Sequence, residues 1–254
     1  MKYIICFLSL LISLSVRGQN KFEVKEKTFI YEAFFINSKG DTLTNEIIEI
    51  SFTDTPWKFQ PKTQKNVVIT YNTDTTGIKS FVYPFEKVRK KHQKFQANKE
   101  SGEKGWEKWT WLAKREVTGY SLNDSVFWTH PPRDNQYIYM QLSGMPEILL
   151  DRLKIGGNWI KQLFILTGFH DWKGNVISKS EVTGTTSYNH KKISVKNAWK
   201  ISIKHEHSKL GNYNSEMIFD EKEYGFLILD NKYPEGNRIV MNLIKMKKST
   251  ITDY

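Results

Sequence analysis

The chain contains almost no cysteine, because Cys6 is the only one among its 254 residues. Cys6 lies in an apolar run near the N-terminus, so the rest of the sequence has no thiol. This excludes disulfide bonds, thiolate metal sites and a cysteine nucleophile from everything after that run. Stability must therefore come from packing, and an aromatic share of 14% with eight tryptophans supplies large side chains for it.

The common catalytic and nucleotide-binding motifs are also missing. The sequence has no Gly-x-Ser-x-Gly nucleophile elbow, no phosphate-binding loop, no glycine-rich dinucleotide motif and no two-histidine zinc helix. It shows no internal repeat, which argues against a propeller or a solenoid. An enzyme such as a metal-dependent hydrolase is therefore the least favoured class of function, and no cofactor is predicted.

Long apolar runs are absent after the first eighteen residues. Met1–Tyr3 is a short basic start, Ile4–Leu14 is apolar, and Val16–Gly18 precedes a plausible cleavage site before Gln19. This arrangement predicts a secretory signal peptide over residues 1–18. The apolar run is shorter than the about 20 residues that a membrane crossing needs. We therefore expect a soluble protein that does not span the membrane and is periplasmic or secreted.

Acidic residues are outnumbered, with 27 Asp and Glu against 38 Lys and Arg, for a formal net charge of +11. A basic protein can attract nucleic acid, an anionic lipid or an acidic protein partner. The lysines are spread through nearly every segment, which is more typical of a soluble exported protein than of a nucleic-acid-binding surface. Nucleic acid is not predicted as a partner, whereas a lipid and an acidic protein both stay open.

Alternating apolar and polar residues fill most of the remaining sequence and predict many strands. The tripeptide Thr118–Tyr120 is read as a break between two of them. The predicted strands cover residues 22–36, 46–52, 67–71, 106–117, 125–129, 137–142, 159–167, 176–188, 199–208, 213–219, 225–229 and 238–246.

The last sixty residues give the clearest pattern. Trp199, Ile201 and Ile203 share one face of a strand with His205 and His207, and polar residues alternate with them. Short turns then separate three further strands, which predicts an antiparallel meander with one buried and one solvated face.

One segment has a helical rather than a strand pattern. In Pro84–Lys99 apolar residues recur at spacings of three and four, with lysines between them, which predicts a short basic amphipathic helix. Together these patterns predict a mainly β fold, an antiparallel curved sheet or open β-barrel with one short helix. Residues 19–254 are expected to form a single domain, with residues 97–105 as the best internal boundary.

Two aromatic positions could line a ligand cavity. Trp109 and Trp111 share one face of a predicted strand, and Trp128 belongs to the same aromatic-rich region. Such a face can bind an acyl chain or a sugar, or it can be part of the core.

His130 and Arg133 flank the rigid Pro131-Pro132 pair, which could present a base and a cation together at the mouth of a barrel. The alternative is structural: the prolines end a strand, Arg133 pairs with a carboxylate, and His130 packs beside Trp128. No nucleophile accompanies the pair. We take Trp109, Trp111, Trp128, His130 and Arg133 as the candidate ligand-binding residues.

His205 and His207 are the best metal candidates, since alternate residues of a strand project side by side. A third ligand is not evident, although His170, His190 and Glu216 are available. The alternative is that both imidazoles only hydrogen-bond to their neighbours.

Several sequence blocks resemble a family of uncharacterised secreted proteins from Bacteroidetes. They include a Trp-x-His-Pro-Pro-Arg motif, and they are Glu116–Tyr120, Val126–Arg133, Met145–Glu147, Gly156–Trp159 and Phe219–Phe226. The chain departs from this pattern by an extra residue in 220–224 and by lacking a cysteine that some relatives have near Asn197. The resemblance implies no established activity. The C-terminal half is also similar to the curved half-barrels of periplasmic lipoprotein carriers, which implies a lipid-handling fold.

These observations favour an exported β protein that acts as a binding or envelope-maintenance module and holds an amphiphilic or lipid ligand in its concave face. The alternative is a periplasmic protein-interaction module, such as an immunity protein or an inhibitor, that uses its basic surface against an acidic partner. A metal-dependent hydrolase is the third class.

Overall fold

The computed structural model describes residues 22–72, 97, 100–101, 115–133, 135–143, 147–165 and 172–251. Its helical segments are the 3₁₀ helices η3 (Asn135–Tyr139) and η4 (Leu150–Arg152) and the short helix α3 (Met140–Ser143). The strands are β1 (Lys27–Ile36), β2 (Thr42–Pro56), β3 (Lys65–Asn72), β4 (Arg115–Leu122), β5 (Val126–Thr129), β6 (Ile148–Leu149), β7 (Asn158–Ile165), β8 (Gly174–His190), β9 (Ile193–His207), β10 (Gly211–Asp220), β11 (Gly225–Lys232) and β12 (Arg238–Lys248).

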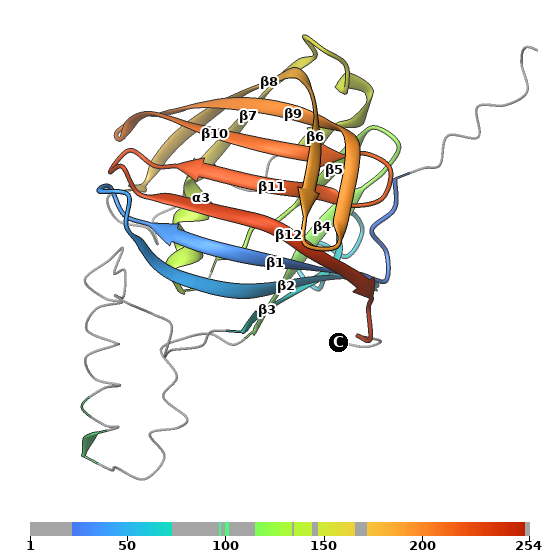
Figure 1. Cartoon of the computed structure of the whole chain (residues 1–254), viewed down its shortest axis with the longest axis horizontal. Helices are drawn as coiled ribbons and strands as arrows, with labels where there is room; N and C mark the ends of the chain where they lie inside the picture. The colour runs from blue at the N-terminus through green and yellow to red at the C-terminus, as the bar shows by residue number, and fades with distance from the viewer. Residues whose placement is uncertain are drawn as a thin grey trace, which may run out of the picture.

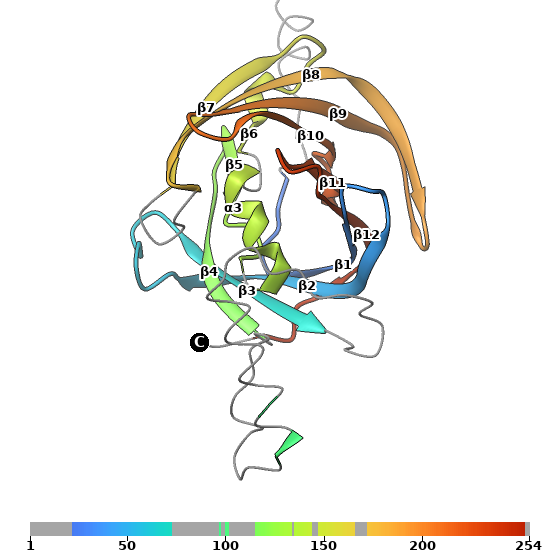
Figure 2. The ribbon, with the colours of Figure 1, turned by 90° about the vertical axis from the view of Figure 1, so that its left-hand side faces the viewer.

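All twelve strands belong to one antiparallel sheet in the order β6-β5-β4-β3-β2-β1-β12-β11-β10-β9-β8-β7. The sheet curls into a nearly closed barrel, with β6 and β7 as its two end strands, which do not pair with each other (Figures 1 and 2). Strand β1 pairs with both β2 and β12, so the N-terminal hairpin and the C-terminal meander share one sheet. The predicted mainly β fold with an open-barrel form is confirmed.

The alternation predicted for the C-terminal strands is observed. In β9, Ile201, Ile203 and His205 are buried inside the barrel, while Lys200 and Lys204 are exposed on its outer face. Strands β9 to β12 follow one another as antiparallel neighbours, which confirms the meander. One face of these strands therefore forms the core and the other faces solvent.

The core is an aromatic layer on the inner face of the barrel, and Phe127 of β5 lies near its centre. The Phe127 ring lies 5.2 Å from Phe22 and 5.3 Å from Phe226, measured between ring centroids, and Phe22 contacts Phe219 edge to face at 5.4 Å. Phe127 is 1% exposed. Residues from both termini and from the middle of the chain thus meet in one hydrophobic cluster.

The segment after β5 closes one end of the barrel. Pro131 and Pro132 are buried and lead the chain from the wall into η3 and α3, which lie across the barrel opening (Figure 2). Tyr139 packs against Trp172 at 4.8 Å, and the Tyr213 hydroxyl donates a 2.7 Å hydrogen bond to the Leu142 carbonyl. Aromatic contacts and tyrosine hydroxyls therefore fasten these two helical segments to the surrounding strands.

The strand predicted over Tyr137–Leu142 is wrong, because these residues form η3 and α3. Tyr137, Tyr139, Met140 and Leu142 are all buried. A short segment that is enclosed by the barrel buries side chains in several directions, so its sequence lacks the single apolar stripe by which a surface helix is recognised.

The break predicted at Thr118–Tyr120 is also wrong, since β4 runs through it. Gly119 is needed there for close packing rather than for a turn. A Cβ atom at Gly119 would lie 2.6 Å from the Trp57 ring, which covers this outer part of β4. The actual turn follows at Asn123, whose Oδ1 accepts hydrogen bonds from the Ser125 and Val126 N–H groups, both at 2.9 Å.

A long hairpin formed by β8 and β9 reaches over the outside of the neighbouring strands (Figure 1). Register shifts at Val182–Gly184 and Thr186–Tyr188 accompany its bend. At its tip, the Tyr188 hydroxyl donates to the Leu243 carbonyl at 2.5 Å, and His190 Nε2 lies 3.3 Å from Glu32 Oε2. These contacts fix the hairpin against β12 and β1.

Two of the sequence predictions fall mostly outside the described residues. The helix predicted over Pro84–Lys99 lies outside the described residues except for Ala97, which is helical. Of the strand predicted over Trp106–Val117, only residues 115–117 are described, and they belong to β4.

Replacing Phe127 with alanine should lower the free energy of unfolding by about 3–5 kcal/mol, because the substitution leaves a cavity in the aromatic layer. The exposed Phe164 is a matched control on β7 at 52% exposure, and its replacement by alanine should cost less than about 1 kcal/mol. Urea unfolding followed by circular dichroism measures both values. Equal losses in the two variants would contradict the central place of Phe127 in the core.

Candidate functional site

The two ends of the sheet overlap instead of pairing. In β7, Lys161 is in phase with the buried Trp159 and Ile165 and therefore lies on the inner face. In β5, Trp128 alternates with the buried Phe127 and therefore lies on the outer face. The Lys161 ammonium nevertheless lies 5.1 Å from the centre of the Trp128 ring. The inner face of β7 thus covers the outer face of β5.

This region, which we call the overlap, comprises Trp128 and His130 at the end of β5, Glu147 before β6, and Lys161 on β7. Lys161 Nζ lies 3.9 Å from Glu147 Oε2, an ion pair that joins the two ends of the sheet. That distance is longer than a hydrogen bond, so Glu147 does not occupy the ammonium donors. The barrel wall is closed here by side chains rather than by a backbone ladder.

A row of aromatic rings runs from the overlap onto the β2–β3 connection. His130 lies 4.5 Å from Trp128 and 5.2 Å from Trp57, and Trp57 lies 5.3 Å from Phe59, measured between ring centroids. All three contacts are edge to face, a favourable geometry for aromatic rings. His130 is also held by its backbone N–H, which donates to the Gly119 carbonyl at 3.1 Å.

Burial lowers the pKa of both basic groups in the overlap. It lowers the pKa of Lys161 to about 8, against an opposing effect of the Glu147 carboxylate. It also lowers the pKa of His130 to about 4, with further lowering by the positive charges of Arg133 and Lys161. At neutral pH the overlap therefore holds an uncharged imidazole beside a charged but partly desolvated ammonium.

Arg133 fixes the exit of the chain from the wall. Its backbone N–H lies 3.1 Å from the Tyr71 hydroxyl and 3.2 Å from Glu116 Oε1, and it can donate to either oxygen. The positive charge of Arg133 is felt at His130, as the lowered pKa shows. The structure thus places three of the predicted residues, Trp128, His130 and Arg133, in one region, and their role in ligand binding stays a prediction.

The other predicted ligand-binding residues, Trp109 and Trp111, lie outside the described residues. Sequence reasoning missed Lys161, Glu147 and Trp57. One signal for Lys161 was available, because a lysine in phase with Trp159 and Ile165 breaks the apolar face of its strand. Glu147 and Trp57 gave no such signal, since they lie outside any alternating pattern.

The predicted metal pair is buried, and both imidazoles have protein partners. His205 lies between two serine hydroxyls, with Nδ1 at 2.8 Å from Ser178 Oγ and Nε2 at 2.9 Å from Ser215 Oγ. Its ring stacks on Tyr213 at 4.8 Å. Burial lowers the pKa of His205 to about 4, so the ring is neutral at pH 7.

His207 closes the turn between β9 and β10. Its Nδ1 accepts hydrogen bonds from the N–H groups of Lys209 and Leu210 at 3.0 and 3.1 Å, and its Nε2 donates to the Trp172 carbonyl at 2.8 Å. Both ring nitrogens are thus engaged, and a metal would have to displace these bonds. No group of three or more His, Cys, Asp or Glu side chains suited to a metal is present among the described residues.

Aromatic side chains fill one part of the described concave face. Phe29, Phe52, Phe127 and Phe226 surround a cavity of only about 10 Å³, which is room for no more than one water molecule. On β7, by contrast, Lys161 and Leu163 of the inner face are half-buried. The overlap is therefore where this concave face meets solvent.

Comparison with known proteins gives only distant likenesses. No family model matches the chain, and no curated protein matches it. A Bacteroides fragilis structure described as an exported protein with a YmcC-like fold has 9% sequence identity and a TM-score of 0.45, over 88% of this chain and 96% of that one. A Parabacteroides distasonis lipoprotein has 7% identity and a TM-score of 0.44, over 90% and 98% of the two chains.

The lipoprotein YmcC from Escherichia coli has 9% identity and a TM-score of 0.36, over 96% of this chain and 97% of that one. These likenesses are too distant to place the chain in a family, so the resemblance to secreted Bacteroidetes proteins stays a prediction. The exported location likewise stays a prediction. In the described part of the chain, no helix has the length and apolarity that a membrane crossing requires.

The buried imidazole of His205 predicts a loss of stability in mild acid. With a pKa of about 4 in the folded protein and 6.5 as its ordinary value, the unfolded chain binds one more proton than the folded protein between these pH values. The free energy of unfolding should therefore fall by about 3 kcal/mol from this residue as the pH drops from 6.5 to 4, and this contribution should level off below. Urea unfolding at a series of pH values compares the wild type with His205→Gln. Parallel pH profiles in the two proteins would show that His205 does not resist protonation.

Proposed function

We propose that the protein is an exported binding protein that holds an amphiphilic ligand, such as a lipid with an anionic headgroup, on its concave face at the overlap. The observation that carries this proposal is the half-buried Lys161 ammonium on the inner face of β7, opposite Trp128. A binding site needs apolar area together with a few well-placed polar groups, and the overlap supplies both.

Electrostatics favours an anionic headgroup. The Lys161 side chain is 26% exposed, so its charge is less screened than that of a surface lysine but remains within reach of a ligand. Arg133 adds a second positive charge close to His130. Two carboxylates lie near these charges, Glu147 beside Lys161 and Glu116 with its Oε1 at 3.2 Å from the Arg133 backbone nitrogen.

The neighbouring surfaces favour an apolar chain. Leu163 is half-buried on the same face of β7 as Lys161, and the half-buried Trp128 adds aromatic area beside the Lys161 ammonium. The cavity among the phenylalanines of the core is too small for a ligand of this kind, which would instead lie along β7. The proposal also retains Trp109 and Trp111 as candidate contacts.

The outer face of β7, β8 and β9 favours a second function, the protein-interaction module. Lys179 of β8 lies directly opposite Lys204 of β9. On its other side, Lys179 lies opposite the exposed Ile160 of β7. Two adjacent lysines beside an exposed apolar side chain would suit an acidic protein partner. Copurification of one acidic protein that is lost when both lysines are replaced by glutamate would favour this function.

Isothermal titration calorimetry with dodecanoate tests the ligand-binding proposal. The wild type should bind this fatty acid, and Lys161→Met should weaken binding about tenfold, because one partly desolvated charge is lost while the length of the side chain is kept. Lys179→Met on the outer face of β8 is the matched control and should bind like the wild type.

The pH provides a further control within this experiment. Dodecanoate is ionised at both pH 7 and pH 9, whereas Lys161 loses most of its charge above its pKa of about 8. Binding by the wild type should therefore weaken over this range by more than binding by Lys161→Met. An unchanged affinity in Lys161→Met at pH 7, or no binding of dodecanoate by the wild type, would overturn the proposal.

A further inference from the structure

A cleft opens at the end of the barrel where β2 ends and β3 begins. It has a volume of about 450 Å³, which is within the usual range for small-molecule sites. Three segments form it, namely the N-terminal residues before β1, the β2–β3 connection and the end of β4. The lining includes Lys25, Lys62, Lys65, Phe22, Tyr120 and Leu122.

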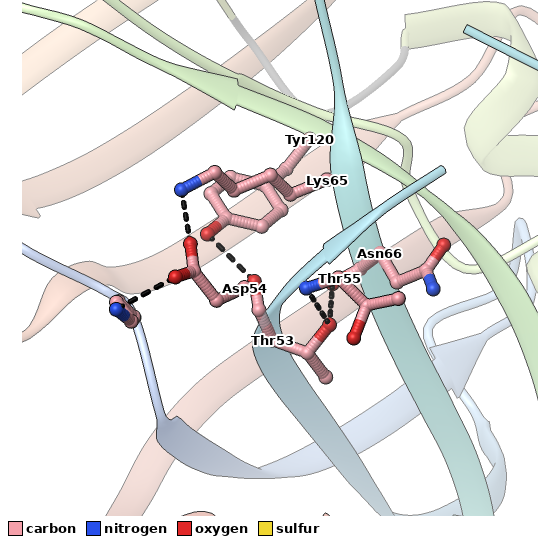
Figure 3. Close-up of polar contacts among 7 residues, drawn as sticks. Thr53, Asp54, Thr55, Lys65, Asn66 and Tyr120 are labelled. Atoms are coloured by element: carbon pink, nitrogen blue, oxygen red, sulfur yellow. Dashed lines mark hydrogen bonds and ion pairs between the residues drawn. The ribbon is translucent and has the colours of Figure 1, made fainter. Parts of the chain in front are cut away.

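Positive charge gathers around this cleft. The carboxylate of Asp54 lies between two of the lining lysines, with Oδ2 at 2.7 Å from Lys25 Nζ and Oδ1 accepting a hydrogen bond from Lys65 Nζ (Figure 3). One carboxylate thus holds two ammonium groups in place, and Lys62 brings a third to the lining. Glu23 is the only carboxylate among the lining residues. Glu26 also acts on Lys25, so the surplus of positive charge is confined to the lining itself, where three ammonium groups meet the one carboxylate of Glu23.

The walls of the cleft are fixed before any ligand arrives. Two backbone hydrogen bonds hold the β2–β3 connection, from the Trp57 N–H to the Gln64 carbonyl and from the Gln64 N–H to the Gln60 carbonyl, both at 2.9 Å. The Tyr120 hydroxyl donates to the Thr53 carbonyl at 3.0 Å (Figure 3), and the Glu26 N–H donates to the Phe52 carbonyl at 3.0 Å. A preformed site avoids the entropic cost of ordering its walls on binding.

The cleft also has apolar lining beside its charges. Phe22 and Leu122 face it together with the ring of Tyr120, and two prolines, Pro56 and Pro61, stiffen the opposite side. The hydroxyl groups of Thr63 and Ser121 are further possible donors. Charge, hydroxyl groups and apolar area within one small volume together define the chemistry of the ligand.

We propose that this cleft binds a small organic anion, a phosphate or carboxylate that carries a compact apolar group. The ammonium groups of Lys25, Lys62 and Lys65 would receive the anion, and the apolar group would lie against Phe22 and Leu122. This site is separate from Lys161 at the overlap and does not depend on the ligand proposed there.

Phenyl phosphate is a suitable probe, measured by calorimetry on the whole protein. It should bind saturably, and Lys62→Gln should weaken binding about tenfold, because it removes a lining charge without disturbing the ion pairs of Asp54. Lys39→Gln in the exposed turn between β1 and β2 is the matched control and should leave binding unchanged, as should Lys161→Met. Benzyl alcohol should bind at least about tenfold more weakly than phenyl phosphate, because it is neutral.

The outcomes separate the two halves of the proposal. Absence of saturable binding, or equal affinities of the wild type and Lys62→Gln, would overturn the anion site. Inorganic phosphate that binds as tightly as phenyl phosphate would overturn the role of the apolar wall. Circular dichroism of Lys62→Gln confirms that a loss of binding does not come from unfolding.

Discussion

Burial of aromatic side chains on the inner face of one curled sheet is the interaction on which the rest of this structure depends. The only cysteine of the chain lies at position 6, so disulfides contribute nothing after that point. Phe22 and Phe127 bring the N-terminal segment and the middle of the chain into contact with Phe226 of the C-terminal meander. Because this cluster holds both ends of the sheet to a common core, the end strands need not pair with each other.

Strands β6 and β7 at the two ends of the sheet do not pair with each other, and the proposed function depends on this. A closed ladder would pair the edge groups of both end strands, whereas the overlap leaves the Lys161 side chain on the inner face of β7 26% exposed. Lys161 is tolerated there because Glu147 and the Trp128 ring partly compensate the lost hydration of its ammonium. In the proposed function, a ligand would therefore lie along β7 and not among the phenylalanines of the core.

The sequence predicted those features that depend on local patterns and missed those that depend on distant contacts. Strict alternation from Trp199 to His207 was enough to predict the meander. Gly119 was misread because the reason for a glycine there is the Trp57 ring, which arrives from a different part of the chain. The contact of Lys161 with Trp128 could not be predicted either, since it arises only when the two ends of the sheet meet. The proximity of Trp128, His130 and Arg133 could be predicted because they lie close together in the sequence around Pro131-Pro132, whereas their role in binding stays a prediction.

The central claim is that ligand contact occurs at the overlap and not in the interior of the barrel. Photo-cross-linking with a dodecanoate analogue that carries a diazirine on its alkyl chain, followed by peptide mapping by mass spectrometry, tests this claim directly. The account predicts cross-links in the peptides that contain Trp128 and Lys161. Cross-links confined to the peptides of β10 and β11, whose Met217 and Leu229 lie deep in the core, would contradict it.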